Sequence, residues 1–198
     1  MGYNSRSNRL FLAFDLPGDV AGAVSEIQQQ IREHGLNIKW VSRRNLHLTV
    51  KFLGDVSPDG TKQVKAAALS AVRGLPPVAV RVKGVGVFPD MRRPRVLWVG
   101  LSGDVAMLTH CHDRLDEQLE KAGFERDQRR FNAHITMGRI KGRVDTKQLA
   151  TALEPFFDFQ AGAFAMDRLV LYKSDLQPAG PVYTKIETFA LEGGKASD

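Results

Sequence analysis

The 198-residue sequence contains a single Cys, Cys111, and no long apolar run. One Cys excludes an internal disulfide, and its place amid helical periodicity indicates a buried or half-buried structural thiol in a reducing setting. No apolar run approaches the roughly 18 residues of a membrane span. The N-terminal stretch MGYNSRSNR also lacks the apolar core of a secretory signal. We therefore expect a soluble, cytoplasmic protein with no membrane partner. We also expect a monomer.

Histidine and threonine are scarce as well, with five His and eight Thr in the chain. Two stretches nevertheless share one pattern, NLHLTVKFLG and FNAHITMGRIK. Each places a His, one apolar residue and a Thr inside a strand-like run, at His47 and Thr49 and again at His134 and Thr136. This composition predicts fewer than one such triplet by chance, so the repetition indicates a function.

The apolar pattern predicts alternating strands and helices. Strands are expected at Arg9–Leu16, Ile38–Val41, Leu46–Leu53, Val78–Phe88, Val96–Leu101, Phe131–Ile140, Phe164–Tyr172 and Val182–Leu191. Helices are expected from the cap Asp19 to Gly35, after SPDG up to Gly74, from about Asp104 to Ala122, and from Asp145 to just before Pro155. The terminal stretches MGYNSRSN and EGGKASD are expected to be disordered.

This element order repeats as a duplicated β-α-β-β unit. The two His are 87 positions apart, and the same shift lays LFLAF, from Leu10, directly on LWVGL, from Leu97. A duplication predicts a single domain of two pseudo-symmetric lobes, about 9–88 and 95–191, with possible strand exchange between them. Each lobe would contribute one His-x-Thr strand to a shared cleft, which is a favoured place for a ligand.

Strand alternation gives each triplet one polar face. Residues i and i+2 point to the same side of a strand, so His47 and Thr49 share a face. The other face is expected to carry Leu46, Leu48, Val50 and Phe52. In the second strand, His134 and Thr136 lie opposite Ala133, Ile135 and Met137. Each strand should therefore pack one side on a core and present an imidazole beside a hydroxyl on the other.

Two imidazoles across a cleft suit a reaction in which one proton is removed as another is delivered. Hydrolysis of a phosphate ester by in-line attack is such a reaction. One His would deprotonate water, the other would protonate the leaving oxygen, and the Thr hydroxyls would donate to the non-bridging oxygens. A strained 2′,3′-cyclic phosphate would need no metal for this.

A metal site is the rival interpretation of clustered His residues. His110 and His112 flank Cys111 in a predicted helix, where positions i and i+2 do not share a face, so this triplet is a poor chelate. Neither His-x-Thr strand supplies a carboxylate beside its His. We therefore expect no metal and no cofactor.

The chain is basic, with a net charge of +6, and its basic residues cluster near the motifs. An anion-binding cleft between the lobes is consistent with this placement. The clusters comprise Arg43, Arg44 and Lys51, then Arg129, Arg130, Arg139, Lys141 and Arg143, and the stretch MRRPR before the Val96 strand. Trp40, Phe11 and Phe131 are candidates to stack a base, although core packing is the safer assignment for each.

Taken together, the quoted motifs resemble the 2H phosphoesterases, and more specifically the RNA 2′,3′-cyclic phosphodiesterases of the 2′-5′ RNA ligase family. The resemblance rests on HLTV and HITM together with RLFLAFDLP, FPDMRRPRVLWVGL and LVLYKSDLQPAGPVY, and spans residues 9–191. It implies a bilobal α+β fold with two antiparallel sheets flanking a central cleft and helices on the outer faces.

The resemblance also implies metal-independent opening of RNA 2′,3′-cyclic phosphate ends to 2′-phosphomonoesters. It makes His47 the general acid on the 3′-oxygen and His134 the base on water, with Thr49 and Thr136 holding the phosphate. A family arginine matches Arg139, but strict alternation puts that residue on the wrong face unless the strand bulges, which Gly138 would permit. Joining or cleavage of 2′-5′ linkages, another cyclic nucleotide phosphodiesterase and a silent RNA-binding clamp remain as alternatives.

Overall fold

The computed structural model describes residues 7–178 and 180–193, which form nine strands, four α-helices and two short 3-10 helices. The terminal segments expected to be disordered fall largely on residues 1–6 and 194–198, outside the described residues. The strands are β1 Asn8–Asp15, β2 Ile38–Trp40, β3 His47–Val56, β4 Val78–Phe88, β5 Val96–Gly103, β6 His134–Ile140, β7 Gln160–Met166, β8 Arg168–Gln177 and β9 Gly180–Ala190. The helices are α1 Gly18–Arg32, α2 Pro58–Val72, α3 Val105–Lys121 and α4 Thr146–Leu153, with 3-10 turns η1 Arg43–Asn45 and η2 Glu154–Phe156.

Four local predictions were wrong. The second helix, expected after SPDG, begins at Pro58 within that stretch, with Ser57 as its cap. The strand expected at Phe164–Tyr172 is two strands, because at Asp167 the chain leaves its pairing with β4 and begins to pair with β1. Phe131 precedes β6 and lies in an irregular segment. The first helix begins at Gly18 with Pro17 as its cap, so Asp19 lies in the first turn. The other caps follow the sequence signals, as when the Asp104 side chain accepts a hydrogen bond from the Met107 N–H.

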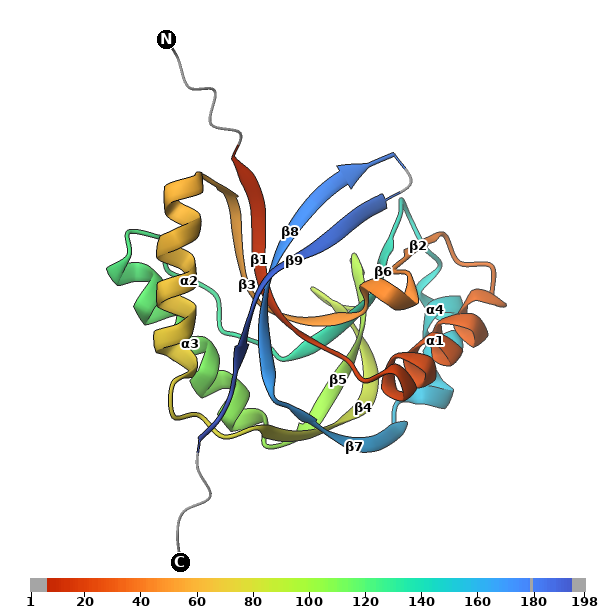
Figure 1. Ribbon diagram of the computed structural model, residues 1–198. Helices are drawn as coiled ribbons and strands as arrows, with labels where there is room; N and C mark the ends of the chain where they lie inside the picture. Colours follow the sequence, from red (N-terminus) through yellow and green to blue (C-terminus); the bar gives the residue numbers. More distant parts are fainter. Residues whose placement is uncertain (1–6, 179, 194–198) are drawn as a thin grey trace, which may run out of the picture.

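All strand pairs in the sheet are antiparallel, which confirms the predicted α+β class. The order is β7-β4-β5-β6-β3-β1-β8-β9, and β2 pairs with β6 beyond the end of β3. One residue pair, Leu48 with Ile135, joins β3 to β6. The two predicted sheets correspond to the halves on either side of this pair, and Figure 1 shows them diverging from it.

Each half of the sheet takes strands from both ends of the sequence. β1 pairs with the late strand β8, which in turn pairs with β9, while the early strand β4 pairs with β5 and β7. The helices cover the outer sides (Figure 1): α2 and α3 lie together beside β1 and β3, and α1 and α4 lie beside β2 and β6. The main apolar core fills the space between helices and sheet, and it includes Leu12, Leu48, Val99, Cys111 and Ile135.

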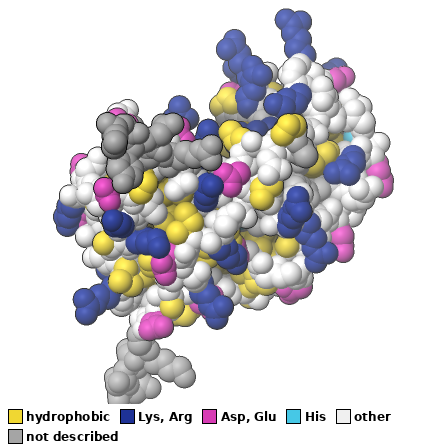
Figure 2. Space-filling view, turned by 45° about the horizontal axis from the view of Figure 1, so that its top comes forward, with side chains coloured by type: hydrophobic (Ala, Val, Ile, Leu, Met, Phe, Trp, Pro, Cys, Tyr) yellow, Lys and Arg dark blue, Asp and Glu magenta, His cyan; other side chains and the backbone are white. Residues whose placement is uncertain are grey.

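Within the described residues, no helix is long and apolar enough to cross a membrane. On the face in Figure 2, the Lys and Arg side chains are spread out rather than gathered into one patch. On this face, the positive charge therefore does not mark a binding site.

Candidate active site

The junction of β3 and β6 places the two His-x-Thr triplets side by side. Leu48 and Ile135 face each other across it, and both side chains are fully buried in the core. Their neighbours on each strand must point to the opposite face because side chains alternate. Antiparallel pairing around this point sets His47 beside Thr136 and His134 beside Thr49.

Both imidazoles are held in the same way. His47 Nδ1 lies 2.7 Å from the Asn45 carbonyl oxygen, and His134 Nδ1 lies 2.7 Å from the Asn132 carbonyl oxygen. A carbonyl oxygen only accepts hydrogen bonds, so each Nδ1 carries a proton and donates it. The Nε2 atom of each ring is therefore the one that gains or loses a proton.

Four of the five predicted site residues line one cavity of about 800 Å³, namely Thr49, His134, Thr136 and Arg139. His47 lines a second hollow of about 330 Å³. Thr49 and His47 are two residues apart on β3 and share a face, so the two hollows adjoin along this strand. The structure thus brings all five residues to adjoining parts of one face of the sheet.

A β-bulge carries Arg139 to the cavity. In the pairing of β5 with β6, Trp98 lies opposite Thr136 and Leu97 opposite Gly138, so Met137 is an extra residue. The bulge reverses the alternation beyond it and turns Arg139 to the face of Thr136. Gly138 was expected to permit this bulge. The structure shows that it makes room for β2, because a Cβ at residue 138 would lie 2.5 Å from Ile38 Cγ2 of β2.

A second bulge on β3 overturns the expected faces of Lys51 and Phe52. Ala13 pairs with Thr49 and Leu12 with Lys51, which leaves Val50 as the extra residue. Lys51 consequently points into the core and is only 4% exposed, so it does not belong to an anion-binding cleft. Phe52, expected on the core face, is 65% exposed and lines the larger cavity.

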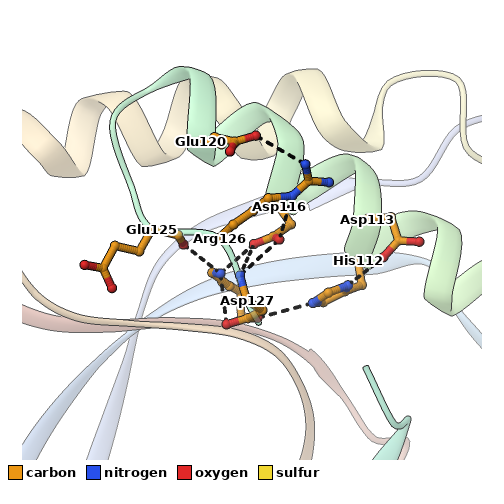
Figure 3. Close-up of polar contacts among 8 residues, drawn as sticks. His112, Asp113, Asp116, Glu120, Glu125, Arg126 and Asp127 are labelled. Atoms are coloured by element: carbon orange, nitrogen blue, oxygen red, sulfur yellow. Dashed lines mark hydrogen bonds and ion pairs between the residues drawn. The ribbon is translucent and has the colours of Figure 1, made fainter. Parts of the chain in front are cut away.

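Lys51 is held by carboxylates from α3 and the segment that follows it. Its Nζ lies 2.5 Å from Asp116 Oδ1 and 3.0 Å from Asp127 Oδ1. Figure 3 shows that Asp127 also faces His112, whose Nε2 is 3.3 Å from Asp127 Oδ2. The His112 ring stacks on Phe131, with ring centroids 4.5 Å apart and an interplanar angle of 12°. This cluster fixes the segment before β6 against the wall of the larger cavity.

The environments of the two catalytic candidates differ in charge. Burial lowers the pKa of His47 below its ordinary value of 6.5, and the charge of His134 also lowers it, while the Asn45 carbonyl and the Asp15 carboxylate act to raise it. Burial also lowers the pKa of His134, where only the hydrogen bond to Asn132 opposes the effect. The carboxylate near His47 favours its protonated form, and His134 lacks such a partner.

Asp15 was not predicted from the sequence. It pairs with His47 across β1 and β3, and its carboxylate accepts hydrogen bonds from Tyr172 and from Lys185 Nζ, the latter at 2.6 Å. These three residues lie at distant places in the chain and meet only through the pairing of β1, β8 and β9. Asp15 lies next to the end of the strand predicted at Arg9–Leu16 and within the stretch RLFLAFDLP, but neither feature indicates that it faces a His.

Aromatic rings pack against both His residues. Phe11 and Tyr183 contact His47 at 5.0 and 5.4 Å between ring centroids, and Phe88 contacts His134 edge-on at 5.0 Å.

Of the three aromatic residues expected to stack a base, Phe11 is 2% exposed, so it cannot do so. Trp40 packs at the edge of the core with Arg32 over its ring, outside both hollows. Phe131 does line the larger cavity.

Arginine predominates among the charged residues of the larger cavity. Arg95, Arg129, Arg130 and Arg139 line it, and Arg44 lines the smaller hollow. The only carboxylate among these lining residues of the larger cavity is Asp127, which is paired with Lys51 and His112. The cavity is therefore suited to an anion.

His110 and His112 do not form a site together. His110 is exposed and His112 is buried on the other side of the helix. Across residues 7–178 and 180–193, no three His, Cys, Asp or Glu side chains are grouped as a metal site would need. Burial raises the pKa of Cys111 to about 11, as expected for a structural thiol.

A duplicated antiparallel fold with one His-x-Thr strand from each repeat defines the class of two-histidine phosphoesterases. The family model for LigT like phosphoesterases matches the chain twice, at residues 14–98 and 99–183. The chain belongs to this family.

Relatives of similar length support this assignment. The RNA 2′,3′-cyclic phosphodiesterase of Methanocaldococcus jannaschii is 35% identical over 179 residues, covering 90% of this chain and 98% of the relative. The protein of the same name from Methanothermobacter thermautotrophicus is 34% identical over 183 residues, covering 92% and 98%.

Solved structures of similar proteins support the same family assignment. A Thermus thermophilus protein superimposes with a TM-score of 0.78 at 27% identity, covering 94% of this chain and all of that one. Escherichia coli LigT complexed with 3′-AMP gives a TM-score of 0.71 at 27% identity, covering 93% and 98%.

Proposed function

We propose that this protein hydrolyses RNA 2′,3′-cyclic phosphate ends to 2′-phosphomonoesters, with His134 as general base and His47 as general acid. The observation that carries this is the β3–β6 junction, which presents two similarly anchored imidazoles beside two hydroxyls. The names of the archaeal relatives support the substrate. The single buried Cys111 supports a cytoplasmic setting, and we propose a monomer.

In this mechanism, water attacks phosphorus opposite the 3′-oxygen. His134 Nε2 takes a proton from the water as the new P–O bond forms. His47, protonated at Nε2, gives its proton to the 3′-oxygen as the P–O3′ bond breaks. The two rings exchange protonation states overall, and solvent restores them before the next turnover.

The phosphate is held by groups that only donate to it. The hydroxyls of Thr49 and Thr136 donate to the non-bridging oxygens, where charge accumulates. Arg139 offers a guanidinium, which suits a phosphate, and reaches the same cavity through the bulge at Met137. Asp15 supports the assignment of the acid, because its negative charge favours protonated His47 and not His134.

The test is incubation of the purified protein, with chelator present, with an RNA oligonucleotide that ends in a 2′,3′-cyclic phosphate. A 2′-phosphate product is expected. A 3′-phosphate would reverse the assignment of the leaving oxygen, and the absence of turnover would contradict the proposal. A parallel incubation with a 2′-5′-linked oligonucleotide separates hydrolysis of cyclic ends from the ligase family's linkage chemistry.

A further inference from the structure

The smaller hollow, on the His47 side of the proposed catalytic pair, is a second place where an anion can bind. Its volume is about 330 Å³, and it is lined by η1 and the start of β3 together with parts of β8 and β9. Its lining residues include two cations, Arg44 and Lys185, and one carboxylate, Asp15. The proposed mechanism uses neither cation.

The charges of the smaller hollow are not balanced. Lys185 Nζ lies 2.6 Å from Asp15 Oδ2, so these two opposite charges offset each other. Arg44 is exposed and remains as a positive charge at the wall of the hollow. Its neighbour Arg43 has a structural contact, because Arg43 Nη2 donates to the Gly18 carbonyl oxygen at 2.6 Å. The hollow therefore offers the Arg44 guanidinium to a bound anion.

The hydrogen bonds of Asn45 fix the backbone next to Arg44. The Asn45 carbonyl oxygen holds the His47 ring at 2.7 Å, and Asn45 Nδ2 donates to the Pro181 carbonyl oxygen of β9 at 3.0 Å. The residue that follows Arg44 is thereby held between the proposed acid and β9. Arg44 is thus positioned at a fixed place relative to His47.

The second repeat has no cation at the corresponding position. The offset of 87 that relates the two His residues also relates Asn45 to Asn132, and both carbonyls hold an imidazole. The same offset makes Phe131 the counterpart of Arg44, and Phe131 stacks on His112. Anchoring an imidazole therefore does not itself require an arginine just before the Asn. The arginine is a feature of the His47 side alone.

The direction of the proposed reaction determines where the RNA strand continues. His47 gives its proton to the 3′-oxygen, so this oxygen and the C3′ atom that carries it lie on the His47 side. C3′ is bonded to C4′, which carries C5′ and the 5′-oxygen that joins the nucleotide to the rest of the RNA. The base is attached at C1′, next to C2′, on the other side of the ribose. The preceding phosphate of the strand is therefore expected at the smaller hollow.

We propose that Arg44 binds the 5′-phosphate group of the terminal nucleotide; this rests on the proposed function, because the role of His47 as the acid sets the orientation of the ribose. A guanidinium suits this group because its paired N–H donors match two phosphate oxygens. A nucleoside cyclic phosphate without a 5′-phosphate lacks this contact. The smaller hollow thus gives the enzyme a preference for the end of an RNA strand over a free nucleoside cyclic phosphate.

The experiment measures the affinity of two product analogues by isothermal titration calorimetry. Uridine 2′-phosphate and uridine 2′,5′-bisphosphate differ only in the 5′-phosphate. The wild type is expected to bind the bisphosphate about tenfold more tightly, the scale of one charge-assisted contact. Arg44→Ala should remove this preference, and Arg44→Glu should reverse it. Because the preference compares two ligands on the same variant, a general loss of affinity cancels.

The matched control is Arg73→Ala, which removes the same charge elsewhere. Arg73 is exposed at the end of α2, on the outer side of the sheet (Figure 1), and should leave the preference as in the wild type. Three results would overturn the proposal. These are a wild type that binds both ligands equally, an Arg44→Ala variant that keeps the preference, and an Arg73→Ala variant that loses it as fully as Arg44→Ala.

Failure of the proposed function is recorded separately. It would appear as absence of hydrolysis, or as a 3′-phosphate product, when the wild type is incubated with a cyclic-phosphate end. The binding measurement requires no turnover, so the two failures are distinguishable.

Discussion

Leu48 of β3 lies directly opposite Ile135 of β6, in the single described residue pair that joins the two halves of the sheet. Both side chains are buried to 0% exposure, so the pair belongs to the core. The residues on either side of the pair are the His and Thr of both motifs, turned to the other face. The packing that closes the core thus also assembles the proposed catalytic groups.

Removing either imidazole should abolish most of the activity. We expect His47→Ala and His134→Ala each to lower turnover of a 2′,3′-cyclic phosphate end by at least about a hundredfold, the scale of lost acid or base catalysis. Circular dichroism should show an intact fold, and His110→Ala, at an exposed position, serves as control. A near-normal rate in either active-site variant would contradict the role of that residue.

The pH profile should reflect two lowered pKa values. Both His pKa values lie below 6.5, mainly through burial, and the active form needs one protonated and one neutral ring. Plotted against pH, kcat/KM should therefore be bell-shaped, with its maximum below pH 6.5 and a decline above it as the acid loses its proton. A maximum well above neutral pH would be inconsistent with these environments.

Asp15 should determine the pH at which kcat/KM declines on the alkaline side of that profile. Its negative charge raises the pKa of His47, so Asp15→Asn should lower this pKa and shift the decline of kcat/KM to lower pH. Measuring kcat/KM across the pH range in the variant and the wild type tests this. An unchanged or upward-shifted limb would show that Asp15 does not act on the acid.

Lys51 should matter for stability rather than for anion binding. The side chains of Lys51 and Asp116 are 3% and 5% exposed, so Lys51→Met leaves a buried carboxylate without its ammonium partner. We expect the free energy of unfolding to fall by about 3–5 kcal/mol in urea titrations. The double variant Lys51→Met/Asp116→Leu should recover much of this loss, and a single variant as stable as the wild type would refute the argument.

Gly138 should tolerate no side chain. A Cβ at this position would lie 2.5 Å from Ile38 Cγ2, so Gly138→Ala should push β2 away and cost about 1–3 kcal/mol in the free energy of unfolding. Because Arg139 is the next residue, activity should fall as well. The matched control is Gly162→Ala, in a strand position with no atom within 4 Å of the added Cβ. Equal thermal stability of the two variants would contradict this prediction.

The sequence by itself determined the elements, the duplication and the paired triplets. These depend on local alternation and helical periodicity, which each segment carries in its own residues, as the match between predicted and observed β4 illustrates. The split at Asp167 was missed because a strand's end there depends on which neighbour it pairs with, not on its own composition.

Only the tertiary structure decided which side chains face the cavity beyond each Thr. A bulge arises when paired strands differ by one residue, so nothing in KFLG alone says that Lys51 turns inward and Phe52 outward. The meeting of Asp15 with Lys185 likewise requires residues 170 positions apart to be brought together by β1, β8 and β9. The alternation of side chains depends on each strand alone, whereas the register of paired strands and the charged neighbours of a residue depend on the assembled sheet.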